Sequence, residues 1–279
     1  MATILDGKAI RDEIAKDLSS KIQNLKSQPK LAIIQIGDVP ESNTYIGQKI
    51  KFGQSVGAIV DHIKLPEDVT MEDVVGKIED LNSDTNTHGI IVQLPIPQNL
   101  DKAAIIESIT PEKDVDGLHS VNVKKLLDND PSGYIPATTK GVITMLEHYN
   151  VTISGKNAVV IGRSALVGKP TALALLNHDA TVTVCHSQTK DLPKMTQAAD
   201  IIISAVGSPG LVTKKHVKPG QVVVDVGTTI VDGKLKGDVA FEEVEKVVEF
   251  ISPVPGGAGP LTVASLFQNL LKAYEGQNA

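Results

Sequence analysis

Two side chains that could do chemistry share one stretch of the chain. Tyr45 and Lys49 lie four residues apart in ESNTYIGQKIKFGQSVG (41–57), whose pattern predicts a helix closed by glycine. Residues at this spacing lie on one helix face, so an amine and an aromatic ring would stand side by side. An amine can carry a proton, and a ring can stack on a flat substrate. An exposed pair with a lysine that extends into solvent fits the same spacing.

Further polar candidates follow a strand and a turn. Gln93 ends the apolar run GIIVQL (89–94), and ligands of open α/β sheets bind at the carboxyl ends of strands. Asp114 and Asp116 lie in PEKDVDGLH, where an ionised carboxylate could accept hydrogen bonds from the N–H donors of a substrate. A solvated turn also explains an Asp-Gly pair.

A strand, a turn and a helix are predicted around VVIGRSALVGKP (159–170). Gly162 permits a tight turn and Gly168 lets the helix pack close to the strand, as in dinucleotide-binding turns. The helix N-terminus would then offer free N–H groups to a pyrophosphate. Arg163 and Ser164 stand where further glycine is expected, and an ordinary strand–helix turn can carry the same two glycines.

The choice between NAD and NADP depends on the next strand. NAD enzymes tend to place an acid on the ribose about 20 residues after the first glycine. Here that region reads TVTVCHSQTK (181–190), without a carboxylate and with Ser187. Hydroxyls and cations suit a ribose phosphate, which an acid would repel. We therefore predict that Arg163 binds this phosphate and selects NADP; the alternative is a surface arginine on a turn.

Alternating strands and helices would position all these residues. The first half of the chain predicts a short strand and a helix at the N-terminus, strands at 31–37, 58–65 and 89–94, helices at 41–57 and 71–82, and an irregular stretch from Ile96 to about Pro136. The second half predicts helices at 138–150, 168–179 and 262–275, strands at 157–162, 181–187, 200–207 and 221–227, and a Gly/Pro loop at 251–262.

Two such alternations predict an α/β fold with two α/β lobes around a cleft, the second a Rossmann-like NADP-binding domain with a parallel sheet. The scarcity of aromatic residues, at 3%, suits a sheet core of Ile, Val, Leu and Ala. We place the domains at 1–137 plus 262–279 and at 138–261.

Charge and composition exclude several classes of function. The formal charge is −6 and no long Lys/Arg run is present, so we expect no nucleic-acid partner. No stretch has the length of apolar sequence that a membrane span requires. The single cysteine, Cys185, forms no intramolecular disulfide, and none of the seven histidines pairs with another at metal-ligand spacing. We expect a cytoplasmic protein without a metal.

The order of these stretches resembles one known family. SNTYIGQK, GIIVQLPIP, PEKDVDGLH, VIGRSALVGKP and SPVPGGAGPLT run from residue 42 to residue 262 and closely resemble the bifunctional methylenetetrahydrofolate dehydrogenase/methenyltetrahydrofolate cyclohydrolase family. The resemblance implies an enzyme of one-carbon metabolism that oxidises 5,10-methylenetetrahydrofolate with NADP and hydrolyses the product to 10-formyltetrahydrofolate. It also implies a homodimer, in which the first domain holds the tetrahydrofolate derivative and the second binds NADP.

The resemblance assigns roles residue by residue. Lys49 matches the catalytic lysine, Gln93 the glutamine that hydrogen-bonds it, and Tyr45 the tyrosine stacked against the folate. Asp116 matches the aspartate that anchors the pterin. The remaining candidates are the cofactor residues Gly162, Arg163, Ser164, Gly168, Ser187 and Thr228, and the loop residues Gly256 and Gly257 beside the folate and nicotinamide.

This chain departs from the family pattern in two places. The family often reads P-C-T-P-x-G before the linker helix, whereas this chain has PATTKG, with Ala137 and Thr139. A strand end that often reads D-V-G-I-N is DVGTT here, with Thr228 and Thr229. Two alternatives remain: a monofunctional NADP dehydrogenase that accumulates the methenyl product, and a pterin- or nucleotide-binding regulator without turnover.

Overall fold

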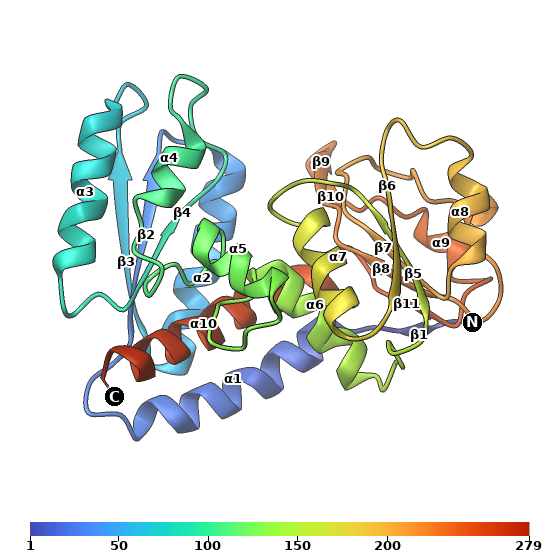
Figure 1. Cartoon of the computed structure of the whole chain (residues 1–279), viewed down its shortest axis with the longest axis horizontal. Helices are drawn as coiled ribbons and strands as arrows, with labels where there is room; N and C mark the ends of the chain where they lie inside the picture. The colour runs from blue at the N-terminus through green and yellow to red at the C-terminus, as the bar shows by residue number, and fades with distance from the viewer. Residues whose placement is uncertain (279) are drawn as a thin grey trace. The chain divides into compact units, whose positions relative to one another are not determined.

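The computed structural model describes residues 1–278, which form two compact units (Figure 1). The three-stranded unit comprises Glu13–Ala137 and the chain from Val263 onward. The six-stranded unit comprises Met1–Asp12 and Thr138–Thr262. The chain passes from one unit to the other within three helices: α1 (Gly7–Gln23), α6 (Ala137–His148) and α10 (Ala258–Gln277).

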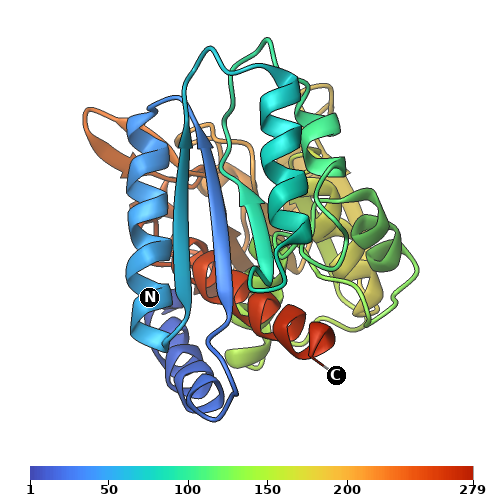
Figure 2. The same ribbon diagram turned by 90° about the vertical axis from the view of Figure 1, so that its left-hand side faces the viewer.

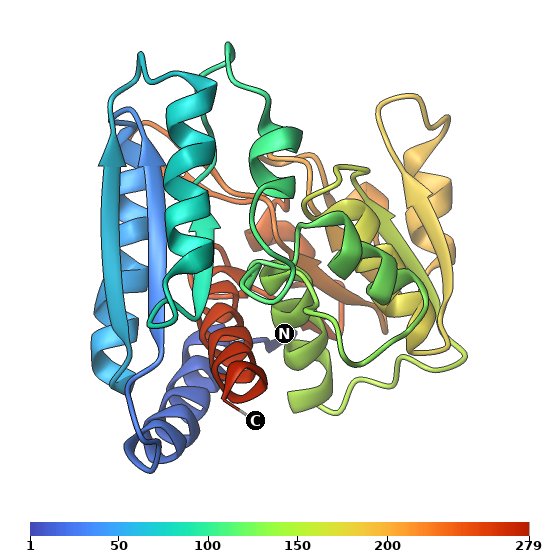
Figure 3. The ribbon, with the colours of Figure 1, turned by 60° about the vertical axis from the view of Figure 1, so that its left-hand side comes forward.

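A short parallel sheet forms the centre of the three-stranded unit. Its order is β3-β2-β4, with β2 at Lys30–Ile36, β3 at Ile59–Leu65 and β4 at Gly89–Val92. The same order is visible in Figures 2 and 3, where β2 lies between the other two strands. Helices α2 (Pro40–Val56) and α3 (Met71–Ser83) connect these strands as the sequence predicts. Gly57 closes α2 in the left-handed conformation with φ 84°.

Alternation along the strands builds two hydrophobic cores on opposite faces of this sheet. On one face Leu31 and Ile33 pack with α2, α1 and α10. On the other face Ala32 and Ile34 pack with α3. Figure 2 shows α2 and α3 on opposite sides of the strands. Because both faces are covered, the strands read as continuous apolar runs.

The stretch between Ile96 and Pro136, expected to be irregular, contains two short helices. They are α4 (Lys102–Glu107) and α5 (Ser120–Leu127). Asp101 caps α4 by accepting hydrogen bonds from the backbone N–H groups of Ala103 and Ala104. Helices this short are stabilised by their caps and by tertiary packing. Their apolar pattern spans too few residues for the sequence alone to predict them.

The six-stranded unit contains a fully parallel sheet in the order β1-β11-β8-β7-β5-β6. The strands are β1 (Thr3–Ile4), β5 (Asn157–Ile161), β6 (Thr181–Cys185), β7 (Ile201–Ser204), β8 (Val222–Asp225) and β11 (Phe250–Ile251). Every residue of β7 and β8 is buried. The unit therefore has the doubly wound arrangement expected of a Rossmann-like domain.

The first twelve residues group with a different compact unit from the one expected for the first domain. We expected them in the first domain, but Met1–Asp12 belongs to the six-stranded unit. The reason is that β1 pairs in parallel with β11, Thr3 opposite Phe250 and Ile4 opposite Ile251. A two-residue strand carries too little sequence to indicate a partner almost 250 positions away.

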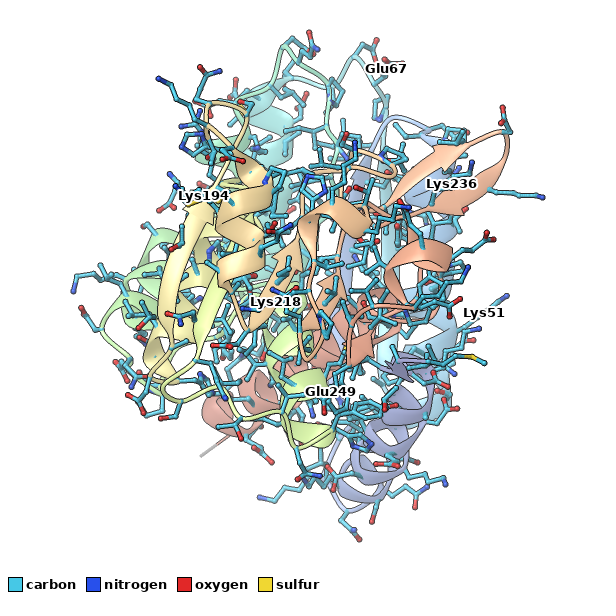
Figure 4. The ribbon with its side chains drawn as sticks, turned by 90° about the vertical axis from the view of Figure 1, so that its right-hand side faces the viewer. Lys51, Glu67, Lys194, Lys218, Lys236 and Glu249 are labelled. Carbon is cyan, nitrogen blue, oxygen red and sulfur yellow. The ribbon has the colours of Figure 1, made fainter. Side chains whose placement is uncertain are left out.

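The remaining elements of this unit are short helices and a hairpin that follows β8. They are α7 (Gly168–Asn177), α8 (Leu192–Ala198), the short 3-10 helix η1 (Lys214–His216), α9 (Phe241–Val244) and the antiparallel hairpin β9 (Thr229–Val231) and β10 (Lys234–Lys236). Figure 4 faces this unit, with Lys194 labelled on α8, Lys218 before β8 and Lys236 on the hairpin. Among residues 1–278, no helix combines the length and apolar character needed to cross a bilayer.

Candidate active site

An amine and an amide meet in the three-stranded unit. Lys49 lies on α2 and Gln93 follows β4, and the Lys49 Nζ atom donates to Gln93 Oε1 at 2.9 Å. Gln93 Nε2 donates to the Leu94 carbonyl at 2.8 Å, and its backbone N–H donates to Ile34 at 2.8 Å. These two bonds fix the amide so that its oxygen faces the amine. Both side chains are half-buried.

The electrostatics of this pair involve Asp116. Burial lowers the pKa of Lys49, and the negative charge of Asp116 opposes this shift. Burial raises the pKa of Asp116, and the positive charge of Lys49 opposes that shift. Each group is therefore less strongly charged than it is in water, and the neutral amine becomes accessible at lower pH. Tyr45, one turn before Lys49 on α2, is also half-buried.

Hydrogen bonds to the Asp114 side chain stabilise the turn that carries Asp116. Asp114 is buried, and it accepts hydrogen bonds from His119 N and Asn122 Nδ2, both at 2.8 Å. Burial raises the pKa of Asp114 to about 7, while these hydrogen bonds lower it. Gly117 adopts φ 72°, and a Cβ atom there would lie 2.7 Å from the Tyr134 carbonyl oxygen. The DVDG turn is thus a fixed platform for Asp116, not the solvated turn considered as an alternative.

Lys113 is a buried cation that sequence reasoning missed. Its side chain donates to three backbone carbonyls at the end of α3, those of Leu81 at 2.9 Å, Asn82 at 2.7 Å and Asp84 at 2.8 Å. Unpaired carbonyls at a helix C-terminus attract a cation. This ammonium therefore anchors the segment that continues into the DVDG turn.

Replacing Lys113 with methionine should lower the free energy of unfolding by about 2 kcal/mol, because the buried carbonyls lose their donor. Urea unfolding followed by circular dichroism measures this change. Lys102→Met, at an exposed position in the same unit, is the matched control, and its free energy of unfolding should stay close to that of the parent protein. Equal stability of the two variants would contradict the anchoring role of Lys113.

In the six-stranded unit, the turn after β5 has the geometry predicted for a dinucleotide. Gly162 adopts φ 127°, and a Cβ atom there would lie 2.5 Å from the Ala205 carbonyl oxygen. A Cβ atom on Gly168 would collide with the backbone of Gly162. Ser164 Oγ accepts hydrogen bonds from Val167 N at 3.2 Å and Gly168 N at 3.3 Å, so it shapes the start of α7. The glycines are required by close backbone packing, as the dinucleotide pattern demands.

Strand register places the two phosphate candidates at neighbouring strand ends. Ile161 of β5 pairs with Cys185 of β6 in parallel. Arg163 and Ser187 therefore both lie two residues beyond this paired position, and both are exposed. A cation and a hydroxyl without a nearby acid in the segment 181–190 fit a ribose phosphate.

The loops after β8 and β11 contain the remaining candidates. Ser252 Oγ accepts from Asp225 N at 2.7 Å, which joins the end of β8 to the SPVPGG segment. Gly256 adopts φ 112°, and its carbonyl accepts from Gly7 N at 2.9 Å. A Cβ atom on Gly257 would lie 2.6 Å from the Pro253 carbonyl oxygen. Within residues 1–278, no group of three or more His, Cys, Asp and Glu side chains could hold a metal ion.

Two family descriptions match this chain. Residues 5–116 match the tetrahydrofolate dehydrogenase/cyclohydrolase catalytic domain, and residues 136–278 match the tetrahydrofolate dehydrogenase/cyclohydrolase NAD(P)-binding domain. The chain belongs to the tetrahydrofolate dehydrogenase/cyclohydrolase family. The NAD(P)-binding domain of the family thus coincides with most of the six-stranded unit and with α10.

Relatives in this family are similar over their full length. A bifunctional protein FolD from Exiguobacterium sibiricum is 46% identical over 276 residues, which cover 98% of this chain and 99% of the relative. A crystal structure of the bifunctional methylenetetrahydrofolate dehydrogenase/cyclohydrolase from Campylobacter jejuni is 45% identical with a TM-score of 0.97 and covers 99% of both chains. A Trypanosoma brucei structure, described as complexed with NADP cofactor and inhibitor, is 39% identical with a TM-score of 0.94 and covers 98% of this chain and 97% of its own.

Within the tetrahydrofolate dehydrogenase/cyclohydrolase family fold, the structure brings together some of the candidate residues. Lys49, Gln93 and Asp116 form one interacting group in the three-stranded unit. Arg163 and Ser187 lie at adjacent strand ends in the six-stranded unit. Thr228 and Thr229 follow β8, and Thr229 Oγ1 donates to the Gly207 carbonyl at 3.0 Å.

Proposed function

We propose that this chain is a bifunctional enzyme, a methylenetetrahydrofolate dehydrogenase and methenyltetrahydrofolate cyclohydrolase that uses NADP. The observation that carries the proposal is the Lys49–Gln93 hydrogen bond beside Asp116, in a chain 45% identical to a Campylobacter jejuni protein whose name gives both activities. An amine whose pKa is lowered by burial, held by a neutral amide and beside a carboxylate, supports a catalytic role.

Lys49 is proposed as the proton carrier of the hydrolytic step. Water adds its oxygen to the methenyl carbon of the cationic substrate and loses a proton, which the neutral amine of Lys49 accepts. The bond from that carbon to one ring nitrogen then breaks, and Lys49 returns the proton to this nitrogen. The second proton of the added water leaves to solvent as the C=O bond of the formyl group forms. The result is 10-formyltetrahydrofolate. Because Gln93 is neutral, it holds the amine without fixing it as an ammonium ion.

Asp116 and Tyr45 are proposed as substrate-binding residues. A carboxylate accepts hydrogen bonds from the amino and ring N–H groups of a pterin. A tyrosine ring stacks on a planar substrate. Asp114, Gly117 and the turn they form support this role, because they fix the backbone on which Asp116 stands. Gly256 and Gly257 remain predicted neighbours of the substrate.

The residues of the six-stranded unit fit NADP. When bound, NADP⁺ accepts a hydride from the methylene carbon of the folate. The Gly162 turn and the start of α7 would receive the pyrophosphate. Arg163 and Ser187 would bind the ribose phosphate, and Thr228 would lie toward the nicotinamide end. The absence of a carboxylate from residues 181–190 supports NADP over NAD.

Two optical assays test the proposal. Purified protein mixed with 5,10-methylenetetrahydrofolate and NADP⁺ should form NADPH and a methenyl product, and methenyltetrahydrofolate supplied alone should decay. Accumulation of the methenyl product without decay would favour a monofunctional dehydrogenase. Ligand binding without turnover would favour a regulator.

We also propose a cytoplasmic homodimer that supplies one-carbon units for purine biosynthesis. Strand β6 is one edge of the six-stranded sheet, and its Val184 side chain is 37% exposed. An open edge with exposed β-branched residues is a template for pairing with a second chain. Sedimentation velocity measures the assembly state directly.

A further inference from the structure

Two buried carboxylates in the six-stranded unit have no role in the chemistry described so far. Asp225 ends β8 and is 3% exposed, and Asp238 follows the β9–β10 hairpin and is fully buried. Buried carboxylates are costly unless hydrogen bonds satisfy them. The partners of these two side chains therefore show what the fold uses them for.

Asp238 binds the segment that follows β7. Its Oδ2 atom accepts from Ser204 Oγ at 2.9 Å and from Val206 N at 2.8 Å. Its Oδ1 atom accepts from Ser208 N at 2.6 Å. A single carboxylate thus fixes both ends of the loop 205–208, which follows the carboxyl end of β7. Charge-assisted bonds of this kind are stronger than bonds between neutral groups.

Asp225 binds the segment that carries Asp238. Its Oδ1 atom accepts from Gly227 N and from Asp238 N, both at 3.0 Å, and its Oδ2 atom accepts from Val239 N at 2.8 Å. The two carboxylates therefore act in series: Asp225 holds the backbone of Asp238, and Asp238 holds the loop 205–208. Burial raises the pKa of Asp225 to about 7, and the charge of Asp238 adds to this rise.

Two glycines leave room for this arrangement. A Cβ atom on Gly227 would collide with the Asp238 carboxylate, and one on Gly237 would collide with the Asp225 carboxylate. The Thr229 hydroxyl adds a further bond between the two loops by donating to the Gly207 carbonyl at 3.0 Å. Side chains thus join the loops after β7 and β8, in addition to the backbone bonds from Val226 N and Gly227 N to the Ser204 carbonyl.

These joined loops lie at the carboxyl edge of the sheet, next to the dinucleotide turn. Ala205 lies directly over Gly162, close enough that a Cβ atom on Gly162 would approach its carbonyl oxygen at 2.5 Å. If the Gly162 turn receives the pyrophosphate and Arg163 the ribose phosphate, the loops after the next strands, β7 and β8, are left for the other half of the dinucleotide.

We infer that Asp225 and Asp238 are positioning residues that hold the loops 205–208 and 226–229 in the shape that receives the nicotinamide half of NADP. They control the dehydrogenase reaction without controlling the cyclohydrolase reaction, because Lys49, Gln93 and Asp116 belong to the other unit. This inference rests on the proposed function and adds residues that act through backbone geometry.

Asp238→Asn in the full-length protein tests the inference. The asparagine keeps the size of the side chain but replaces one acceptor oxygen with an NH₂ group that cannot accept from Val206 N or Ser208 N. We expect kcat/KM for NADP⁺ in the dehydrogenase reaction to fall about tenfold, mainly through a higher KM. Cyclohydrolase kcat/KM, measured on methenyltetrahydrofolate without NADP⁺, should stay within about twofold of the parent protein. Asp232→Asn, at the exposed tip of the hairpin, is the matched control for both reactions.

A milder variant keeps the test decisive if Asp238→Asn does not fold. Ser204→Ala removes one donor to Asp238 and should lower dehydrogenase kcat/KM about threefold in the same selective way. A parallel loss of both activities, or an unchanged KM for NADP⁺, overturns the inference. Failure of the proposed function itself is distinguishable, because the parent protein would then lack one of the two activities before any substitution is made.

Discussion

Lys49→Ala should slow the hydrolysis of methenyltetrahydrofolate by about 100- to 10,000-fold, the usual contribution of a positioned proton carrier. The amine donates to Gln93 at 2.9 Å, and burial lowers its pKa, so that the neutral base forms at a lower pH than it does in an exposed lysine. Alanine removes the base and leaves water to lose its proton to solvent. The measurement is the decay of methenyltetrahydrofolate absorbance after subtraction of the uncatalysed rate.

Lys51→Ala is the matched control for this prediction. Lys51 lies two residues further along α2, is exposed and is labelled in Figure 4. Its removal deletes the same charge from the same helix and should leave hydrolysis unchanged. Gln93→Glu sharpens the test, because a carboxylate in contact with Lys49 would favour the ammonium form and should also slow hydrolysis. Unchanged hydrolysis in Lys49→Ala would remove the proposed role of this lysine.

Arg163→Ala should raise the KM for NADP⁺ about 100-fold while the KM for NAD⁺ changes little, since charge-assisted bonds to a phosphate contribute about 1.5–3 kcal/mol. The reason is that Arg163 and Ser187 follow neighbouring strand ends in register, and NAD lacks the phosphate that they would bind. The measurement is initial dehydrogenase velocity with each cofactor at saturating methylenetetrahydrofolate.

The control for Arg163 is a cation at the other end of the sheet. Lys218 precedes β8 at its amino end, is exposed and is labelled in Figure 4. Lys218→Ala removes one positive charge from the same unit and should change the KM for neither NADP⁺ nor NAD⁺. An equal rise in KM for NADP⁺ and NAD⁺ in Arg163→Ala would mean that the arginine binds a part common to both molecules.

The sequence predicts the central elements of this fold because they are long and strongly patterned. The runs at 31–37, 58–65 and 89–94 are confirmed as β2, β3 and β4, and the glycine that closes the predicted helix at 41–57 is confirmed as Gly57. The short N-terminal strand is also confirmed, as β1, but its partner β11 and helix α4 are not predicted from the sequence. Helix α4 has six residues and β11 has two, so packing and distant pairing decide their structure. Helix α10 begins at Ala258, four residues before the predicted start at 262.

Some residues of the candidate site can be predicted from the sequence, and others only from the fold. Lys49, Gln93 and Asp116 are recognisable because each belongs to a specific local string, and the structure shows the Lys49–Gln93 bond that the resemblance implies. Lys113 and Asp238 lack such a signal. In EKDVDG and GKLKGDV they read as solvated charges in polar turns. Only the fold shows that Lys113 caps a helix and that Asp238 holds a loop. The groups that they bind lie about thirty residues earlier in the chain.

The pairing of β1 with β11 has a consequence for biosynthesis. Residues 3 and 4 are synthesised almost 250 positions before their partners, Phe250 and Ile251. The segment that forms β1 therefore stays without its strand partner while the residues between them are made, and completion of this sheet requires the closure of a very long loop.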